Sequence, residues 1–232
     1  METNGIPGAR ARRGRGRSTL GEFMVVMLGV LVALALEQWL SDWHEARRAD
    51  DTLLAMHEEL RDFAVVFSLR QATSACAFQW LQELETHLAG SAALPALGAV
   101  GRTPYLFSSR SGWRGGAPEL LSRHRGPQQA LVYGEIYQGM EEFSALAQQE
   151  QAHWARLQTL EVAEGVVDGP RRWRLREDVS GARNANMLLT AIANQMLERL
   201  SGIGIDTDVP LPVDMQQRPI CQPMPPAEGP AG

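Results

Sequence analysis

The chain has 232 residues, of which 44% are hydrophobic, and a formal net charge of −5. This length suits one membrane anchor and one domain of ordinary size. Because the chain is acidic outside its first residues, we expect no nucleic-acid partner.

The chain begins with an arginine-rich arm and a long apolar segment. Residues 1–18 lack apolar periodicity, and we expect a disordered cytoplasmic arm there. Residues 19–40 are predicted to form a transmembrane helix, with Phe23 to Leu36 apolar throughout. As a helix, Leu20 to Leu40 would span about 31 Å, close to the thickness of one hydrocarbon core. The lipid bilayer is therefore the first expected partner.

Basic residues are unequally distributed about this segment. Five arginines precede it, whereas only Arg47 and Arg48 follow it closely. The positive-inside rule then predicts a cytoplasmic N-terminus and a periplasmic C-terminal domain, in a bacterial inner membrane.

A cleaved signal peptide is the alternative, since Ala33 to Ala35 has an A-x-A pattern. We favour a retained anchor because no Gly or Pro lies between Val30 and Ala89. Both interpretations export the domain.

Helical periodicity continues through residues 41–205, and no strand alternation is found. Long helices are predicted at about 41–89, 128–164 and 170–201. Short connections and the equal lengths of 53–89 and 128–164 favour antiparallel neighbours. The expected fold is all-α: a single N-terminal transmembrane helix continuing into an elongated antiparallel three-helix bundle. Residues 90–126 would form a small loop-rich cap, and 206–232 a proline-rich disordered tail.

The two cysteines lie in different settings. Cys76 is in a predicted helix and Cys221 in the proline-rich tail. An oxidising compartment would permit a disulfide between them. The interpretation we favour is a small core residue and a separate tail thiol.

The apolar run GEFMVVMLGVLVALALEQW is followed by a charged helix, a helix with Tyr133 and Tyr137, and the run WARLQTL from Trp154. In these features the chain resembles a family of uncharacterised bacterial single-pass membrane proteins, over about residues 20–205. The resemblance implies the topology above and supplies no catalytic residues.

No catalytic motif is present, and we expect no enzyme, cofactor or metal. Glu150-x-x-His153 has the spacing of half a di-iron site, but no second copy exists. Nothing indicates a small-molecule substrate.

Trp173 lies among four arginines, which we interpret as a solvated helix start paired with acids on a neighbour. Those arginines are Arg171, Arg172, Arg174 and Arg176.

Two candidate sites remain. Arg70, Glu150 and Asn186 each interrupt an apolar seam. An antiparallel register would place Glu150 opposite residue 67 and Asn186 opposite residue 148, which predicts a buried polar layer that fixes helix register. The second candidate site is a transmembrane dimer face, built around a small-xxx-small pair. It consists of Glu22, Val26, Gly29 and Ala33. The alternative is a monomeric anchor, in which Gly29 reflects only the tolerance of membrane helices for glycine.

These patterns predict a membrane-anchored structural or interaction protein of the bacterial envelope. Its helical domain would bind a second copy of the chain or another envelope protein. The alternative is an extracytoplasmic sensory bundle that binds a small ligand. That function usually requires a cytoplasmic output module, and the 18-residue arm is too short for one.

Overall fold

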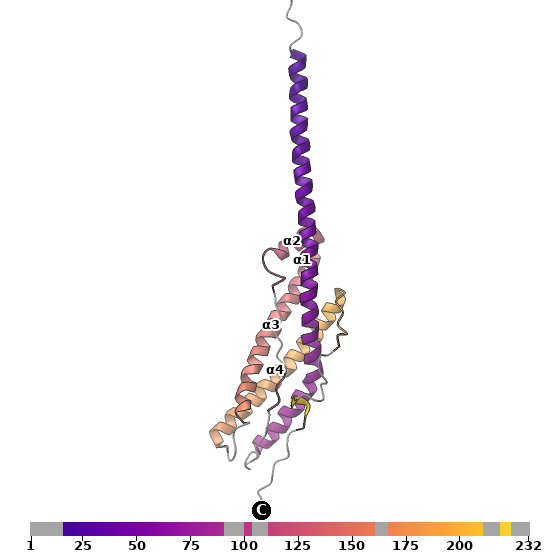
Figure 1. Cartoon of the computed structure of the whole chain (residues 1–232). Helices are drawn as coiled ribbons and strands as arrows, with labels where there is room; N and C mark the ends of the chain where they lie inside the picture. The colour runs from indigo at the N-terminus through magenta and orange to yellow at the C-terminus, as the bar shows by residue number, and fades with distance from the viewer. Residues whose placement is uncertain (1–15, 91–99, 104–110, 161–166, 211–218, 224–232) are drawn as a thin grey trace, which may run out of the picture. The chain divides into compact units, whose positions relative to one another are not determined.

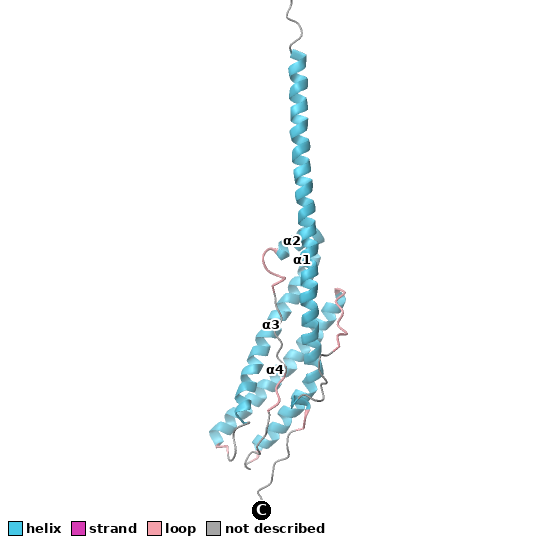
Figure 2. Ribbon diagram, in the orientation of Figure 1, coloured by secondary structure: helices cyan, strands magenta, loops and turns pink. Residues whose placement is uncertain are grey.

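The computed structural model describes residues 16–90, 100–103, 111–160, 167–210 and 219–223. Within these ranges the chain is helical and has no strand, as predicted (Figure 2). The α-helices are α1 (Gly16–Ala89), α2 (Ala117–Arg125), α3 (Pro127–Leu157) and α4 (Gly169–Gly202). The described residues also include two 3-10 turns, η1 (Gln158–Leu160) and η3 (Pro219–Cys221). Most of the predicted arm lies outside the described residues.

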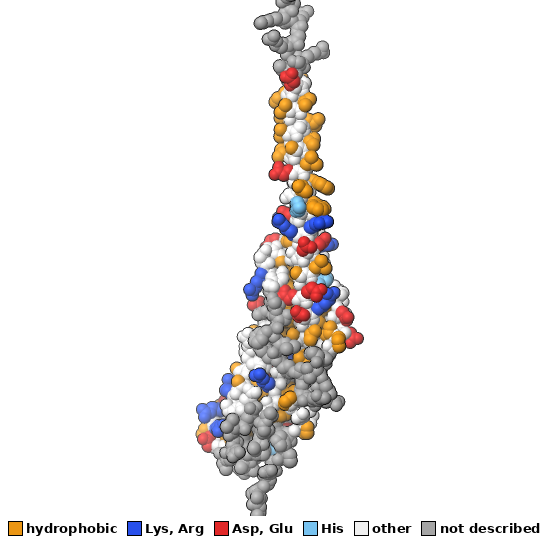
Figure 3. Space-filling model, viewed as in Figure 1, with side chains coloured by type: hydrophobic (Ala, Val, Ile, Leu, Met, Phe, Trp, Pro, Cys, Tyr) orange, Lys and Arg blue, Asp and Glu red, His pale blue; other side chains and the backbone are white. Residues whose placement is uncertain are grey.

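The chain divides into two compact units, Met1–Asp50 and Asp51–Gly232. In the first unit every residue from Leu20 to Leu40 is exposed. Figure 3 shows hydrophobic side chains gathered along this part of the helix. Helix α1 contains an 18-residue window of mean hydropathy 2.1, none of it buried. By length and composition this helix is able to cross a membrane.

Local signals explain where the helices of the second unit begin. Asp168 caps α4 by accepting a hydrogen bond from the Arg171 backbone N–H at 2.7 Å. Pro127 stands in the first turn of α3, where no backbone donor is needed. Gly126, at a φ of 94°, separates α3 from α2 with a conformation that glycine adopts readily.

The contacts between α1 and α3 show that these helices run parallel. Along α1, the partners of His57, Phe67 and Arg70 are Tyr133, Phe143 and Glu150, so the residue numbers rise together. Trp80 and Trp154 continue the series. The predicted antiparallel pairing of 53–89 with 128–164 is therefore wrong.

The connection between the two helices explains the parallel arrangement. Thr103 hydrogen-bonds Glu150 in the second half of α3, and Gly112 hydrogen-bonds Glu59 much earlier on α1. Segment 90–126 is thus long enough to return the chain to the beginning of the unit, like the crossover connections of other bundles. Residues 100–103, which belong to the predicted cap, lie beside the helices and do not form a cap. Equal helix lengths contain no information about direction.

Helix α4 runs opposite to both partners (Figure 1). Its late residue Arg199 pairs with Glu135, whereas its early residue Asp178 binds Arg156. Against α1, Asn186 bonds Ser74 and Arg183 pairs with Glu85. Side chains of α1, α3 and α4 consequently share one interior.

That interior contains two apolar clusters. The first contains Phe67, Tyr133, Ile136 and Met196, with residues of α1, α3 and α4 around them. The second collects residues 77–88 of α1, the end of α3 and the beginning of α4, around a fully buried Trp154. Burying each large apolar side chain stabilises the fold by about 1.5–3 kcal/mol.

Candidate functional site

Arg70 of α1 and Glu150 of α3 form a buried ion pair. The guanidinium donates two hydrogen bonds to the carboxylate, at 2.8 and 2.6 Å. The side chains are only 5% and 1% exposed. Two parallel N–H···O bonds give this pair a defined orientation as well as charge neutralisation. The two residues interrupt the apolar seams at one height, as predicted.

The pair was predicted from an incorrect helix direction. The expected antiparallel register and the observed parallel register coincide at this height, so both bring Glu150 close to Arg70. Away from this height the two registers diverge, and contacts such as Trp80 with Trp154 are incompatible with the antiparallel one.

A third residue completes the pair and was missed from the sequence. Thr103 is fully buried and its hydroxyl donates to Glu150 Oε2 at 2.9 Å. Gln151 donates to the Thr103 carbonyl at 3.3 Å, which holds the segment against α3. Thr103 lies in a stretch without periodicity, so no pattern in the sequence indicated its position.

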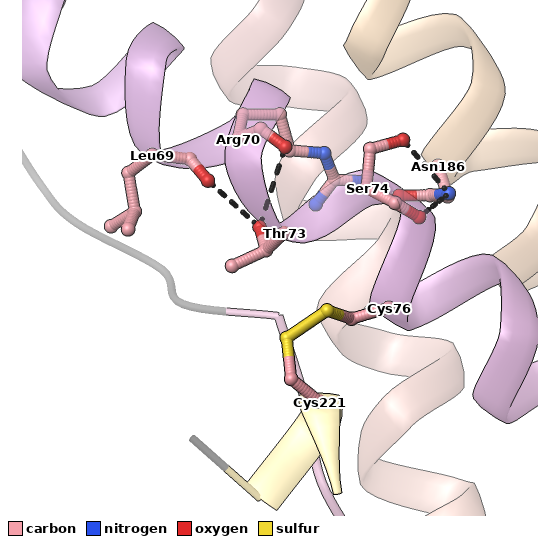
Figure 4. Close-up of a disulfide and its surroundings, with 7 residues drawn as sticks. All are labelled: Leu69, Arg70, Thr73, Ser74, Cys76, Asn186 and Cys221. Carbon is pink, nitrogen blue, oxygen red and sulfur yellow. Dashed lines mark hydrogen bonds between the residues drawn. A yellow bond between two sulfur atoms is a disulfide. The ribbon is translucent and has the colours of Figure 1, made fainter. Parts of the chain in front are cut away.

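Asn186 belongs to a neighbouring group and not to the ion pair. Its amide donates to the Ser74 carbonyl at 3.1 Å, one turn of α1 beyond Arg70 (Figure 4). Thr190 also bonds the Ser74 hydroxyl, at 2.7 Å. The prediction that Asn186 supplies hydrogen bonds to the charged pair is therefore wrong. Helix α4 reaches α1 on a side where the Ser74 carbonyl and hydroxyl accept the amide.

Cys76 and Cys221 form a disulfide (Figure 4), which contradicts the expectation of two separate thiols. The tail reaches α1 because Ile220 is 2% exposed and packs into the second apolar cluster. Gly101 makes this approach possible: a Cβ there would lie 2.5 Å from the Ile220 backbone nitrogen. The predicted disordered tail is thus wrong for residues 219–223.

A second polar group lies near the beginning of the unit. Glu59 accepts hydrogen bonds from the Gly112 backbone N–H at 2.7 Å and from the Tyr137 hydroxyl at 3.2 Å. Burial and the nearby Glu59 carboxylate raise the pKa of Tyr137 well above its ordinary value. Nearby, His57 contacts the Tyr133 hydroxyl at 2.5 Å, and burial together with the charge of Arg61 lowers the pKa of His57.

An open groove of about 830 Å³ lies between α2 and α3, beside this group. Trp113 stacks on Tyr137 with ring centroids 5.6 Å apart and packs over Gly134. Leu131, on the groove, is 61% exposed. Trp113 thus packs the connection before α2 against α3.

The half-site spacing of Glu150 and His153 does not produce a shared ligand set. Glu150 faces Arg70, whereas His153 contacts Asp178 of α4 at 2.9 Å. Arg156 donates to the same Asp178 oxygen at 2.7 Å. Among the described residues, no group of three acidic, histidine or cysteine side chains is arranged to hold a metal ion.

The transmembrane face stays a prediction. Glu22, Val26 and Ala33 are exposed, and a Cβ built at Gly29 would meet no atom within 4 Å in the single chain. The described part of the chain thus leaves this face exposed, and pairing with a second chain is untested.

No protein-family model, curated protein or solved structure matches the chain. The resemblance to single-pass membrane proteins accordingly stays a prediction, and the functional argument depends on the geometry alone.

Proposed function

We propose that this chain is a membrane-anchored structural or interaction protein of the bacterial envelope. Its transmembrane segment would be Leu20 to Leu40, and its exported domain a three-helix bundle of α1, α3 and α4. The observation that carries this proposal is that every residue of that segment is exposed although it is almost wholly apolar. Soluble monomers rarely expose a contiguous apolar surface above a few hundred Å². A lipid bilayer provides the apolar environment in which such a helix is stable.

The disulfide supports export of the domain. Cys76 and Cys221 are the two cysteines of the chain, and they are joined. Disulfides persist in oxidising compartments such as the periplasm and are rare in the cytosol. This agrees with the excess of arginine before the anchor, which favours a cytoplasmic N-terminus.

The polar groups of the domain favour a structural role over a catalytic one. Arg70 and Glu150 neutralise each other's charge, Asp178 is held by His153 and Arg156, and both sets join two helices. Such pairs fix which helices neighbour each other and in which register. A sensory bundle is the second candidate, and the open groove beside Trp113 is the feature that favours it.

Reporter fusions test the proposed topology. Alkaline phosphatase fused after residue 232 should be active, and a cytoplasmic reporter at the same place should be silent. The reverse result would refute the orientation. A mature N-terminus near Leu36 would show cleavage and refute the anchor.

Crosslinking in intact cells, followed by mass spectrometry of the membrane fraction, tests the interaction role. We expect reproducible crosslinks from the exported domain to a second copy or to one envelope protein. A chain that crosslinks to no protein would contradict it.

A further inference from the structure

The beginning of α4 presents a cationic surface with an exposed aromatic ring. Trp173 is 61% exposed, and Arg174 and Arg176 beside it are exposed as well, together with one acidic side chain, Glu177. Arg171, which is partly exposed, precedes them in the same helix. We call Trp173 and these three arginines the basic tryptophan surface. A rigid base supports it, because Leu175 between the arginines is buried in the second apolar cluster.

The arginines of α4 differ in their described partners. Arg171, Arg174 and Arg176 have no carboxylate partner among the described residues. The acids just before α4, Glu161 and Glu164, lie outside the described residues, so the expected pairing with acids on a neighbour stays a prediction. In contrast, Arg183 and Arg199 of the same helix each bind a carboxylate.

The helix end itself disfavours this charge. The N-terminus of a helix has a partial positive charge, so cations there are unfavourable. Several arginines and a large exposed indole at this position therefore reduce the local stability of the helix. Such conflicts with local stability are expected at functional sites.

We propose that the basic tryptophan surface binds the anionic phospholipid headgroups of a lipid bilayer. Guanidinium groups bind phosphate oxygens in a bidentate manner. An indole with one polar edge prefers the headgroup region of a bilayer. Anionic lipids attract nearby arginines through their negative surface potential. This proposal goes beyond the proposed function and does not depend on the orientation of the anchor.

The test uses the full chain in nanodiscs of neutral phosphatidylcholine, mixed with separate vesicles and separated by flotation. We expect binding to vesicles that contain phosphatidylglycerol, no binding to pure phosphatidylcholine vesicles, and a loss of binding at high salt. Each arginine near the surface contributes a factor of about five, so R174Q/R176Q should weaken binding about 30-fold. W173A should weaken binding with little change in its salt dependence.

A matched control is R102Q/R114Q, which removes two exposed arginines elsewhere in the same unit. It should bind anionic vesicles like the unaltered chain, and all variants should keep the same melting temperature. Equal losses in R174Q/R176Q and R102Q/R114Q would overturn the proposal, since binding would then follow net charge alone. Retention by a soluble anionic polysaccharide without binding to vesicles would also overturn it, in favour of a polymer partner. The reporter fusions measure topology only. A failure of the vesicle-binding test would therefore leave the result of the reporter fusions unaffected.

Discussion

The buried pair of Arg70 and Glu150 allows the sharpest stability prediction. Replacing either residue by alanine leaves the other as an uncompensated charge, because both side chains are at most 5% exposed. Breaking a buried ion pair in this way costs about 3–5 kcal/mol. For a domain of this size each kcal/mol lowers the melting temperature by roughly 2–4 °C, so we expect a decrease of about 6–20 °C.

The assay is a double-mutant cycle on the full chain in detergent, with unfolding of the domain followed by circular dichroism. The double variant R70A/E150A should lose less than the sum of the two single losses, since it leaves no isolated charge. Arg199 and Glu135 provide a matched control, with a similar distance of 2.8 Å but side chains 35% and 63% exposed. Breaking that pair should cost under about 1 kcal/mol. Small additive losses at Arg70 and Glu150 would refute the conclusion that the pair is buried.

Four further predictions concern other features of the chain. Replacing Cys76 and Cys221 by serine should destabilise the domain by about 2–5 kcal/mol, because the disulfide closes a long loop. The G101A variant should cost about 1–3 kcal/mol, since its Cβ would collide with the tail backbone. Because the pKa of His57 is lowered in the fold, the unfolded chain binds its proton at higher pH. Stability should therefore fall as pH decreases below about 6.5, and H57Q should reduce this fall in melts at pH 7.5 and 5.5. Finally, G29I should weaken dimerisation in a membrane two-hybrid assay.

Each of these predictions has a control and a contradicting result. The serine variant should be insensitive to added reductant, whereas equal melting of oxidised and reduced wild-type chain would contradict a stabilising disulfide. G202A is the control for G101A, because a Cβ at Gly202 meets nothing within 4 Å. Equal free energies of unfolding for the two variants would contradict the predicted collision at Gly101. An unchanged pH dependence in H57Q would exclude His57 as its source. L31I changes the opposite helix face from Gly29, and equal effects of the two substitutions would argue against the predicted dimer face.

Local patterns in the sequence determined the helices and the apolar segment. The helix beginnings near Pro127 and Pro170, the end of α1 before Gly90 and the exposed run from Leu20 follow from short-range signals. Burial of Arg70 and Glu150 also followed from sequence, because a polar residue in an apolar seam is placed in the interior by its neighbours.

Tertiary structure alone decided the direction of α3, the disulfide and the role of Thr103. Helix periodicity specifies which face is buried but not whether two faces meet in parallel or antiparallel orientation. The choice was made by segment 90–126, which has no periodic pattern and returns beside Glu150 before α3 begins. Similarly, Cys221 reaches Cys76 because Ile220 is buried against a glycine far away in the sequence. Contacts between irregular segments depend on long-range packing, which local sequence signals do not specify.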